Sequence, residues 1–398
     1  MILYAAIAAA AVFLAALAGR ENFTENPSGG APHGRAVSSA AMFWLFVLLA
    51  VPAILRYNVG NDYMRYVAFM HLADVHAYVP TEWGFNALVR LIYGLCGYEN
   101  YLLVFAVFAV LTIALFLLDI RLMAEDFAFS FFLFMCFGFY FRTYNTVRYF
   151  FALSLVLLSL HLLLTGYRIS FVLTVLAAAL FHKSALVVLA LYPLCMIRWT
   201  IPGALAGAGI VAVLSLLKDF WLRVVIRLYP SYRGTSFEAG GTRSMANILC
   251  CAAVLCLAAA AAFVERKKGE QPAHGSTAAK SAGRRRVYLQ MNAAAFVLHL
   301  FCWFIPEISR IGYYLTITQI FLIPMLLKSF PGSADAEDSG AGRIGKVLLT
   351  PRGVMTGLAI AAALCYFVLF LKTADNPAIR ILPYQTFLFH DEIPSIIE

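Results

Sequence analysis

Long apolar runs recur along this chain, and they constrain its fold more than any other feature. Most of them approach the roughly 20 apolar residues that a helix needs to cross a bilayer. They lack the strict alternation of membrane barrel strands. The runs cover residues 2–18, 42–55, 100–118, 126–141, 147–164, 169–181, 185–197, 202–217, 244–264, 287–304, 310–328 and 353–372. The sequence therefore predicts an all-α, polytopic integral membrane protein with about 12 membrane-crossing or re-entrant helices.

The composition excludes a soluble globular protein. The 398 residues are 62% hydrophobic and 13% charged, with a mean hydropathy of +0.81. A soluble domain of this size leaves too much surface in water for such a composition. The net charge of +9 indicates basic loops that orient helices and meet anionic lipid, and we expect no nucleic acid partner. The eight cysteines have no metal-like or disulfide-like spacing, so we expect no metal and no cofactor.

Two polar, basic stretches, 265–286 and 329–352, interrupt the apolar runs, and their composition predicts flexible cytoplasmic linkers. Placing them in the cytoplasm puts 16 of the 30 Lys and Arg residues inside and 14 outside, which is a weak bias. The outer charges, however, lie among Tyr, Trp, Asn and Gly. We therefore expect a single membrane domain, residues 1–398, with its active site on the outer face. The outer segments are 56–99, 142–146, 182–184, 218–243, 305–309 and the tail after 372.

The first outer segment begins RYNVGNDYMRY, at residues 56–66. Gly60 and Asn61 end the preceding helix, and Asp62 is placed to cap the next one. A helix cap with a surface ion pair explains the stretch, and so does the rim of an active site. The same choice applies to Glu82, which stands beside Trp83 as an interfacial anchor or as a functional carboxylate.

Two further stretches place polar side chains at the ends of apolar helices. In YFRTYNTVRYFFALSL, residues 140–155, Asn145 is a candidate cap, and Arg148 lies one turn into an apolar helix. That position is costly without an anionic partner, although an arginine can also extend toward the interface. In LFHKSALVV, residues 180–188, His182 separates two short runs. These are either two helices or one long helix with a packing histidine.

Arginines recur in the remaining outer segments. The loop 218–243 contains an expected amphipathic helix with Arg223 and Arg227, followed by Arg233. Arg310 begins another span. The planar guanidinium fork suits phosphate and diphosphate oxygens, and aromatic rings suit sugar faces as well as membrane interfaces. A lipid-diphosphate-linked sugar would satisfy both preferences.

Several of these elements, taken in order, resemble the EpsG family, which is similar to the Wzy-type polysaccharide polymerases. The resemblance runs from about residue 50 to 390. It rests on Arg56, VGNDY at 59–63 with Tyr66, E-x-G-F at 82–85, N-x-x-R at 145–148 with Ala152, FHKSAL at 181–186, Arg310 in R-x-x-x-Y, and PYQTF at 383–387. The chain departs from the family at Tyr149, where Gln is frequent, and in its longer polar linkers.

The resemblance implies a polymerase of polyprenyl-diphosphate-linked oligosaccharide repeats at the outer face of the bacterial inner membrane, and is compatible with a GT-C-like helix arrangement. Glycosyl transfer would release the polyprenyl diphosphate, whose charge must be stabilised, and would need a base for the acceptor hydroxyl. We expect the base to be Asp62, then His182, then Glu82. The expected substrate-binding residues are Arg56, Arg65, Tyr66, Asn145, Arg148, Arg233 and Arg310.

Other functions remain open at this stage. A transporter or flippase of lipid-linked glycan predicts arginines lining a path from both sides, with inverted repeats. An O-antigen ligase or a membrane acyltransferase is also compatible with His182. Expected partners are the lipid-linked oligosaccharide and the bilayer, with chain-length regulator and flippase proteins as further candidates.

Overall fold

In this computed structural model, the described residues are 1–19, 32–228, 233–234, 238, 240–268, 277–306, 308–332, 349–377 and 379–389. The chain divides into two compact units. Unit 1 comprises Met1–Ala185 and Ala359–Glu398, and unit 2 comprises Leu186–Leu358. We describe each unit by itself. That residues 1–398 act as a single membrane domain stays a prediction.

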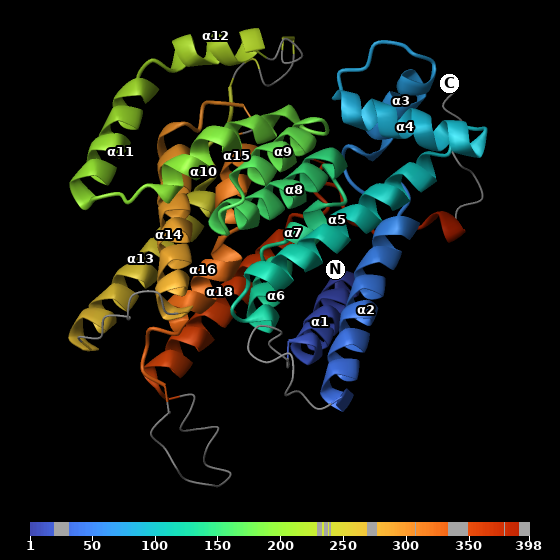
Figure 1. The fold of residues 1–398 in the computed structure, drawn as a ribbon. Helices are drawn as coiled ribbons and strands as arrows, with labels where there is room; N and C mark the ends of the chain where they lie inside the picture. The colour runs from blue at the N-terminus through green and yellow to red at the C-terminus, as the bar shows by residue number, and fades with distance from the viewer. Residues whose placement is uncertain are drawn as a thin grey trace. The chain divides into compact units, whose positions relative to one another are not determined.

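In unit 1, the shorter helices α3 and α4 lie together at the end toward which the long helices α2 and α5 run (Figure 1). Its helices are α1 (Ile2–Ala18), α2 (Pro32–Leu55), α3 (Tyr63–Asp74), α4 (Trp83–Cys96), α5 (Tyr101–Met123), α6 (Phe127–Cys136), α7 (Phe139–Arg142), α8 (Val147–Leu164), α9 (Arg168–Ala179), most of α18 (Pro351–Lys372) and the 3₁₀ helix η4 (Phe387–Phe389).

Unit 2 contains α10 (Val188–Met196), α11 (Ile201–Ser215), α12 (Lys218–Leu228), α13 (Met245–Lys268), α14 (Thr277–Phe301), α15 (Ile308–Thr316), α16 (Gln319–Leu327) and the start of α18. The 3₁₀ helix η1 (Lys183–Val187) spans the division between the units. Helix α12 carries Arg223 and Arg227 as predicted, and bends by 80° from α11.

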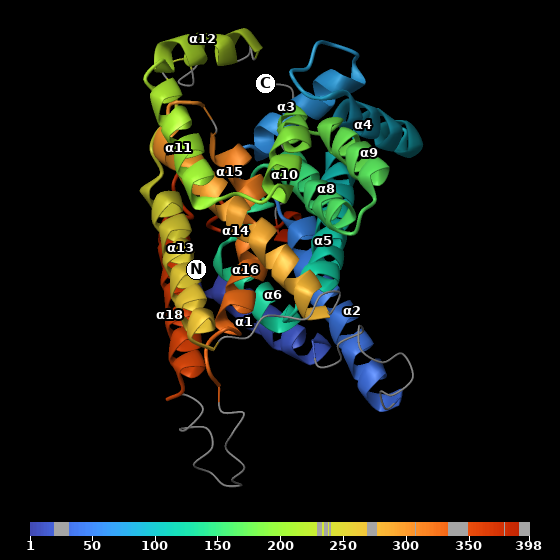
Figure 2. The ribbon, with the colours of Figure 1, turned by 60° about the vertical axis from the view of Figure 1, so that its left-hand side comes forward.

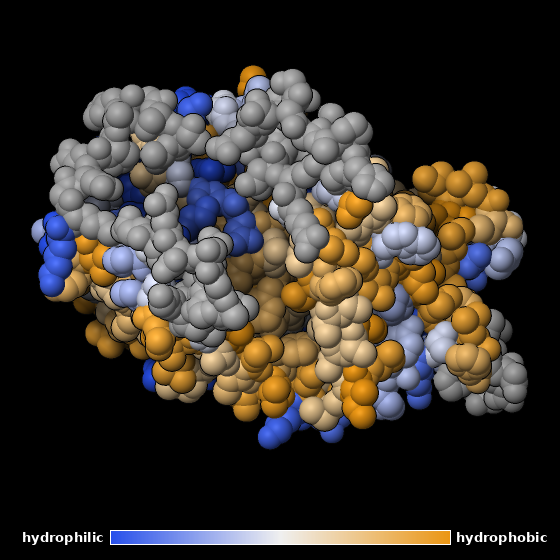
Figure 3. Space-filling view, turned by 90° about the horizontal axis from the view of Figure 1, so that it is seen from below, coloured by the Kyte–Doolittle hydropathy of each residue, from blue (hydrophilic) through white to orange (hydrophobic). Residues whose placement is uncertain are grey.

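The described residues confirm an all-α, multi-pass membrane protein. Six helices are long and apolar enough to cross a bilayer, or seven if the bent pair α11 and α12 is one span. Four shorter apolar helices accompany them, at Ile2–Ala18, Phe127–Cys136, Arg168–Ala179 and Lys183–Met196. Hydrophobic side chains predominate among the described residues on the face shown in Figure 3, and hydrophilic side chains gather in one part of it.

The two short runs around His182 form separate helices. Helix α9 ends at Ala179, a turn follows, and η1 begins at Lys183 before α10. The alternative of one long helix is therefore wrong. Polar residues at 182–184 and the change to 3₁₀ geometry interrupt the α-helical hydrogen bonds there.

The loops predicted to be cytoplasmic meet at one end of unit 1. The backbone oxygen of Ala18 accepts hydrogen bonds from Ser38 Oγ at 2.7 Å and from Arg121 Nη1 at 3.1 Å. Asp126 caps α6 by accepting a hydrogen bond from the Phe129 amide at 2.9 Å. These bonds satisfy helix-end groups that have no partner within their own helices.

Part of the predicted linker 265–286 is helical. Helix α13 continues to Lys268 and α14 begins at Thr277, so a linker over the whole stretch is wrong, and residues 269–276 lie outside the described residues. Arg285 pairs bidentately with Glu265, at 2.5 and 2.8 Å, and Ser329 Oγ donates to Glu265 at 2.6 Å. These contacts hold Arg285 in place as part of α14. Within the second predicted linker, residues 333–348 lie outside the described residues.

An aromatic core in unit 1 lies beneath the opposite end, where α3, α4, α5 and α8 meet. Tyr63 stacks on Phe105 with ring centroids 4.5 Å apart, and Phe85 stacks on Phe108 at 5.7 Å. Phe151 meets Phe181 edge to face at 4.7 Å. Such pairs add about 0.5–1.5 kcal/mol each beyond their buried area. This core fixes the helices that carry the polar residues described next.

Candidate functional site

The predicted outer segments of unit 1 contact one another at the end that carries α3 and α4 (Figures 1 and 2). The Gly84 amide donates to the backbone oxygen of Leu180 at 2.8 Å, and the Asp62 amide donates to Asn145 Oδ1 at 3.1 Å. Four separate parts of the sequence therefore meet here: the loop 56–62, the start of α4, the start of α8 and the turn after α9. Which side of the membrane they face stays a prediction.

Arg148 and Glu82 form an ion pair at the centre of this group. Arg148 Nη1 donates to Glu82 Oε2, and the two side chains are 14% and 15% exposed. The Lys183 amide donates to the other carboxylate oxygen at 3.2 Å. Glu82 thus supplies the anionic partner that the sequence position of Arg148 requires. The pair joins α4 to α8 and to the turn that carries His182.

Aromatic rings cover the Arg148 guanidinium. Its carbon lies 5.5 Å from the ring centroid of Tyr66 and 5.3 Å from that of Phe85, within the range of cation–π attraction. Arg148 Nε is buried and has no hydrogen-bond partner among the described residues. The guanidinium therefore has a fixed plane and at least one donor that no described residue uses.

The start of α4 lies too close to the end of α9 for any side chain at Gly84. A Cβ atom there would lie 2.7 Å from the backbone oxygen of Leu180. Glycine permits the hydrogen bond between the two backbones. This close approach places Glu82, two residues earlier, next to the Lys183 amide.

His182 lies on the same turn and is half-buried. Its Nδ1 shares a hydrogen bond of 2.7 Å with Ser184 Oγ, and its ring meets the Tyr149 ring edge to face at 5.2 Å. Ser184 lies inside η1 with its hydroxyl on His182. His182 directly precedes Lys183, whose amide donates to Glu82.

The loop 56–62 carries Asp62 at the start of α3. Asp62 holds the N-cap position, but its side chain makes no capping hydrogen bond, so the predicted side-chain cap is wrong. The predicted cap at Asn145 is also wrong, because Thr146 holds that position and Asn145 Oδ1 accepts from the Asp62 amide instead. Tyr66, one turn along α3, then lies against Arg148.

Arg56 is the most enclosed of the predicted site residues, at 2% exposed. Its guanidinium carbon lies 5.3 Å from the Phe105 ring centroid and 5.2 Å from that of Tyr144. Arg56 Nε is buried without a hydrogen-bond partner among the described residues, whose ion pairs do not include Arg56. Burial lowers the pKa of Arg56, and the hydroxyls of neighbouring tyrosines, led by Tyr63, act against that effect.

Three further predicted substrate-binding residues lie on α3 or in unit 2. Arg65 is exposed on α3. Arg233 is exposed in unit 2, beside a turn in which the Gly234 amide donates to Glu238 at 2.8 Å. Arg310 is half-buried on α15, also in unit 2. The contacts of unit 1 therefore bring together Arg56, Asp62, Tyr66, Glu82, Asn145, Arg148 and His182, while Arg65, Arg233 and Arg310 stay predictions.

Sequence reasoning missed two residues at this end of unit 1, Asn58 and Arg380. Arg380 Nη2 donates to Asn58 Oδ1 at 2.6 Å. Both have positive φ, 50° and 44°. The order Asn, Val, Gly at 58–60 could have indicated a left-handed turn, because Asn and Gly tolerate that conformation best. No local pattern marks Arg380.

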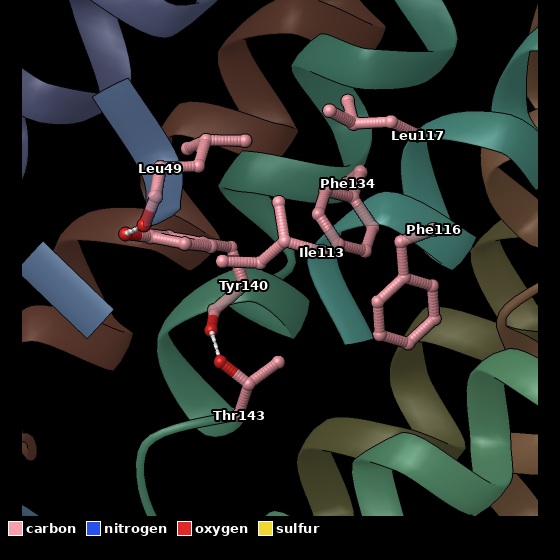
Figure 4. Close-up of a pocket in the computed structure, with 7 residues that line it drawn as sticks. All are labelled: Leu49, Ile113, Phe116, Leu117, Phe134, Tyr140 and Thr143. Atoms are coloured by element: carbon pink, nitrogen blue, oxygen red, sulfur yellow. Dashed lines mark hydrogen bonds between the residues drawn. The ribbon is translucent and has the colours of Figure 1, made fainter. Parts of the chain in front are cut away.

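A small apolar pocket lies elsewhere in unit 1, between α2, α5, α6 and α7 (Figure 4). It has a volume of about 10 Å³, roughly the room that one water molecule needs, and is lined by Leu49, Ile113, Phe116, Leu117, Phe134, Tyr140 and Thr143. Ligand sites usually measure roughly 300–1,000 Å³ and contain convergent polar groups. Tyr140 already donates to the Leu49 backbone at 2.7 Å, so we interpret the pocket as packing space.

Within the described ranges, no group of three or more His, Cys, Asp or Glu residues could hold a metal ion. The expectation of metal-independent chemistry stays a prediction.

Comparison with known proteins identifies one relationship over most of the chain. The model of the EpsG family matches residues 39–386. The matched region includes the Arg148–Glu82 pair, the loop 56–62 and the segment around Arg380. No curated protein and no solved structure matches the chain.

Proposed function

The chain belongs to the EpsG family, which is associated with exopolysaccharide biosynthesis, and from this premise we propose that it is a polymerase of lipid-linked glycan. It would join polyprenyl-diphosphate-linked oligosaccharide repeats by glycosyl transfer at the outer face of the bacterial inner membrane. The growing glycan leaves its carrier, and a hydroxyl of the incoming lipid-linked repeat attacks the anomeric carbon. The leaving group is the polyprenyl diphosphate.

The observation that carries this proposal is the Arg148–Glu82 pair between two aromatic rings. Arginine presents five N–H donors in a rigid fork, and Arg148 Nε is unused among the described residues. A diphosphate offers oxygens of matching spacing. Its developing charge is the group that such a fixed cation stabilises in the transition state.

Glu82 is our first candidate for the base because it contacts Arg148 directly. A diphosphate that arrives at Arg148 competes with Glu82 for the same donors. The carboxylate is then free to accept the proton of the acceptor hydroxyl, so substrate binding and base activation are coupled. Asp62 and His182, which the sequence ranked first and second, become the second and third candidates, in the same cluster.

The other arginines have different proposed roles. Arg56 is enclosed, so we assign it to holding the loop 56–62 and to contributing positive potential from behind it. Arg65, Tyr66 and Asn145, in unit 1, are proposed to bind the acceptor repeat. Arg233 and Arg310, in unit 2, stay predicted substrate-binding residues. No metal or cofactor is required by these roles.

The membrane arrangement belongs to the same proposal. The candidate spans, the bent pair and the four shorter apolar helices, together with α14, give about 12 crossing or re-entrant helices, which is the number expected from apolar length. The Arg148–Glu82 end of unit 1 would face the periplasm or the exterior. Chain-length regulator and flippase proteins are proposed partners.

The test uses a strain from which the gene is deleted and gel analysis of its lipid-linked glycan. The wild-type gene should restore a ladder of repeats, whereas Arg148→Lys and Glu82→Gln should not. Lysine keeps the charge but loses the fork, and glutamine keeps the shape but loses the base. Arg168→Lys, at an exposed position at the start of α9, is the matched control. Wild-type ladders from both site variants, at equal membrane levels, would overturn the proposal.

The product also separates the rival functions. A ligase transfers chains whose lengths do not change, an acyltransferase leaves length unaltered, and loss of a flippase stops repeats from reaching the outer face. We further expect unchanged polymerisation in isolated membranes treated with EDTA. Loss of activity that a divalent ion restores would contradict the metal-independent mechanism.

A further inference from the structure

The C-terminal strap, residues 379–386, binds along the loop 56–62. The amides of Gly60 and Asn61 donate to the backbone oxygens of Arg380 and Ile379, at 2.8 and 3.0 Å. The Tyr57 amide donates to the Gln385 oxygen at 2.9 Å. The strap passes beside the end of α2 (Figure 1), and these bonds tie the last part of unit 1 to its first outer loop.

Two side chains add to this backbone pairing from the strap and from α1. Tyr384 donates its hydroxyl to the backbone oxygen of Pro52 at 2.9 Å, and Tyr4 donates to that of Ile381 at 2.5 Å. Ile381 is fully buried. The strap is thus an integral part of unit 1 rather than a loose tail.

The contact with the least favourable backbone geometry is the pair Asn58 and Arg380. Both residues have positive φ, at 50° and 44°. For arginine this conformation is uncommon and costs free energy. The hydrogen bond from Arg380 Nη2 to Asn58 Oδ1, at 2.6 Å, lies at the exposed surface and has a charged donor. It holds two unfavourable turns against each other, which is a reason to expect a functional constraint there.

The strap also encloses Arg56. Thr386 forms an isolated antiparallel bridge with Arg56, and Arg56 is 2% exposed. On its other side, the loop meets the turn before α8. A Cβ atom at Gly60, whose φ is 103°, would overlap the backbone oxygen of Tyr144. The loop is therefore held between the strap and the residues that precede Arg148.

We propose that Asn58 and Arg380 are positioning residues: their hydrogen bond locks the C-terminal strap onto the loop 56–62, which sets Asp62 beside Asn145 and keeps Arg56 enclosed. The effect of Asn58 and Arg380 on the reaction rests on the proposed function. Their effect on how the strap binds the loop does not rest on it, because the accessibility of Arg56 can be measured without any glycan.

The variants are chosen to keep the backbone conformation. Asn58→Gly and Arg380→Gly accept positive φ without cost but remove the hydrogen bond. Asn58→Asp keeps the acceptor and tolerates the left-handed turn, so it should retain wild-type behaviour. Lys372→Gly, at the exposed end of α18, is the matched control for a lost surface charge near the strap.

The first readout is chemical. Phenylglyoxal, which modifies accessible arginines, is applied to membranes that contain the full chain, and modified peptides are quantified by mass spectrometry. Labelling of Arg56 relative to the exposed Arg65 should rise about tenfold in both glycine variants, the factor for one lost hydrogen bond to a charged group. It should stay at the wild-type level in Asn58→Asp and Lys372→Gly.

The second readout is the ladder of repeats in the deletion strain, at matched membrane levels. Both glycine variants should shorten or weaken it, and Asn58→Asp should restore it. If Arg56 stays protected and the ladder stays at the wild-type level in the glycine variants, the proposed hydrogen-bond lock is wrong. It is also wrong if Asn58→Asp fails to give wild-type behaviour in either readout. Increased labelling with a wild-type ladder overturns the positioning role. If deletion of the gene leaves the ladder intact, the proposed function fails while the labelling result still decides the lock.

Discussion

Arg148 and Arg56 occupy similar places in the sequence, each at a boundary between an apolar helix and an outer segment, but their surroundings in unit 1 differ. Arg148 is paired with Glu82 and is 14% exposed. Arg56 lies between Phe105 and Tyr144 at 2% exposed, and the ion pairs of the described residues do not include it. Both have a buried Nε that no described residue uses.

This difference indicates which of the two arginines can exchange its partner for a substrate anion. An arginine that is paired with a carboxylate can donate its hydrogen bonds to another anion instead, because one anion replaces another. The released carboxylate can then act as a base. Arg56, which has no carboxylate partner among the described residues, has no such exchange available. Its attraction to the rings is strongest when water is excluded, so its enclosure serves the packing of the loop. Identical side chains at similar boundaries therefore serve chemistry in one case and positioning in the other.

Loss of Arg148 should have the largest effect on activity. Arg148→Ala removes the cation that stabilises the leaving diphosphate, and we expect at least about a hundredfold less polymer, as for loss of one dedicated transition-state donor. The ladder of repeats, normalised to membrane protein, measures this.

The double variant Arg148→Ala/Glu82→Ala sharpens the result. If Arg148 only neutralised Glu82, removing both would restore activity, because no unpaired charge would remain. We expect the double variant to remain inactive. A recovered ladder would show that Arg148, like Arg56, has a structural role and does not act on the substrate.

Among the changes proposed in and around the loop 56–62, which carries Arg56, Gly60→Ala should cause the largest loss of stability. Its φ of 103° and the overlap of a Cβ atom with the Tyr144 oxygen both oppose a side chain, and together they cost roughly 2 kcal/mol or more. The thermal midpoint in detergent should fall. Gly94→Ala is the control, since a Cβ atom there meets nothing within 4 Å and alanine favours the helix by up to about 1 kcal/mol. Equal midpoints for both variants would contradict the tight contact between the loop and the turn at Tyr144.

Arg56→Lys should have the smallest effect. Lysine keeps the charge but loses the planar stacking on Phe105 and Tyr144, at a cost of about 1 kcal/mol. We expect a slightly lower thermal midpoint and less than tenfold loss of polymer. An effect on the ladder as large as that of Arg148→Ala, without a change in midpoint, would show that Arg56 acts on the substrate directly.

Part of this site could be predicted from local sequence. The position of Arg148 one turn inside an apolar helix requires an anionic partner, and the structure supplies one. The identity of that partner could not be read from the sequence, because Glu82 lies 66 residues away. Asn58 and Arg380 are 322 residues apart, and nothing near Arg380 marks it. The side-chain caps predicted at Asp62 and Asn145 were wrong. Asn145 Oδ1 accepts from the Asp62 amide instead of capping α8, and Asp62 holds the N-cap position of α3 without a capping hydrogen bond.

The sequence by itself determined the membrane class, because the length and polarity of a helix decide whether it can lie in lipid, and these are local properties. It also placed arginines, carboxylates and His182 in the segments between the apolar helices or at their ends. Only the tertiary structure decided which of them meet. Gly84 contacts Leu180, the strap covers the loop 56–62, and Arg148 finds Glu82 while Arg56 finds aromatic rings. Contacts of this kind depend on how distant helices pack, and a single sequence contains no local signal for that packing.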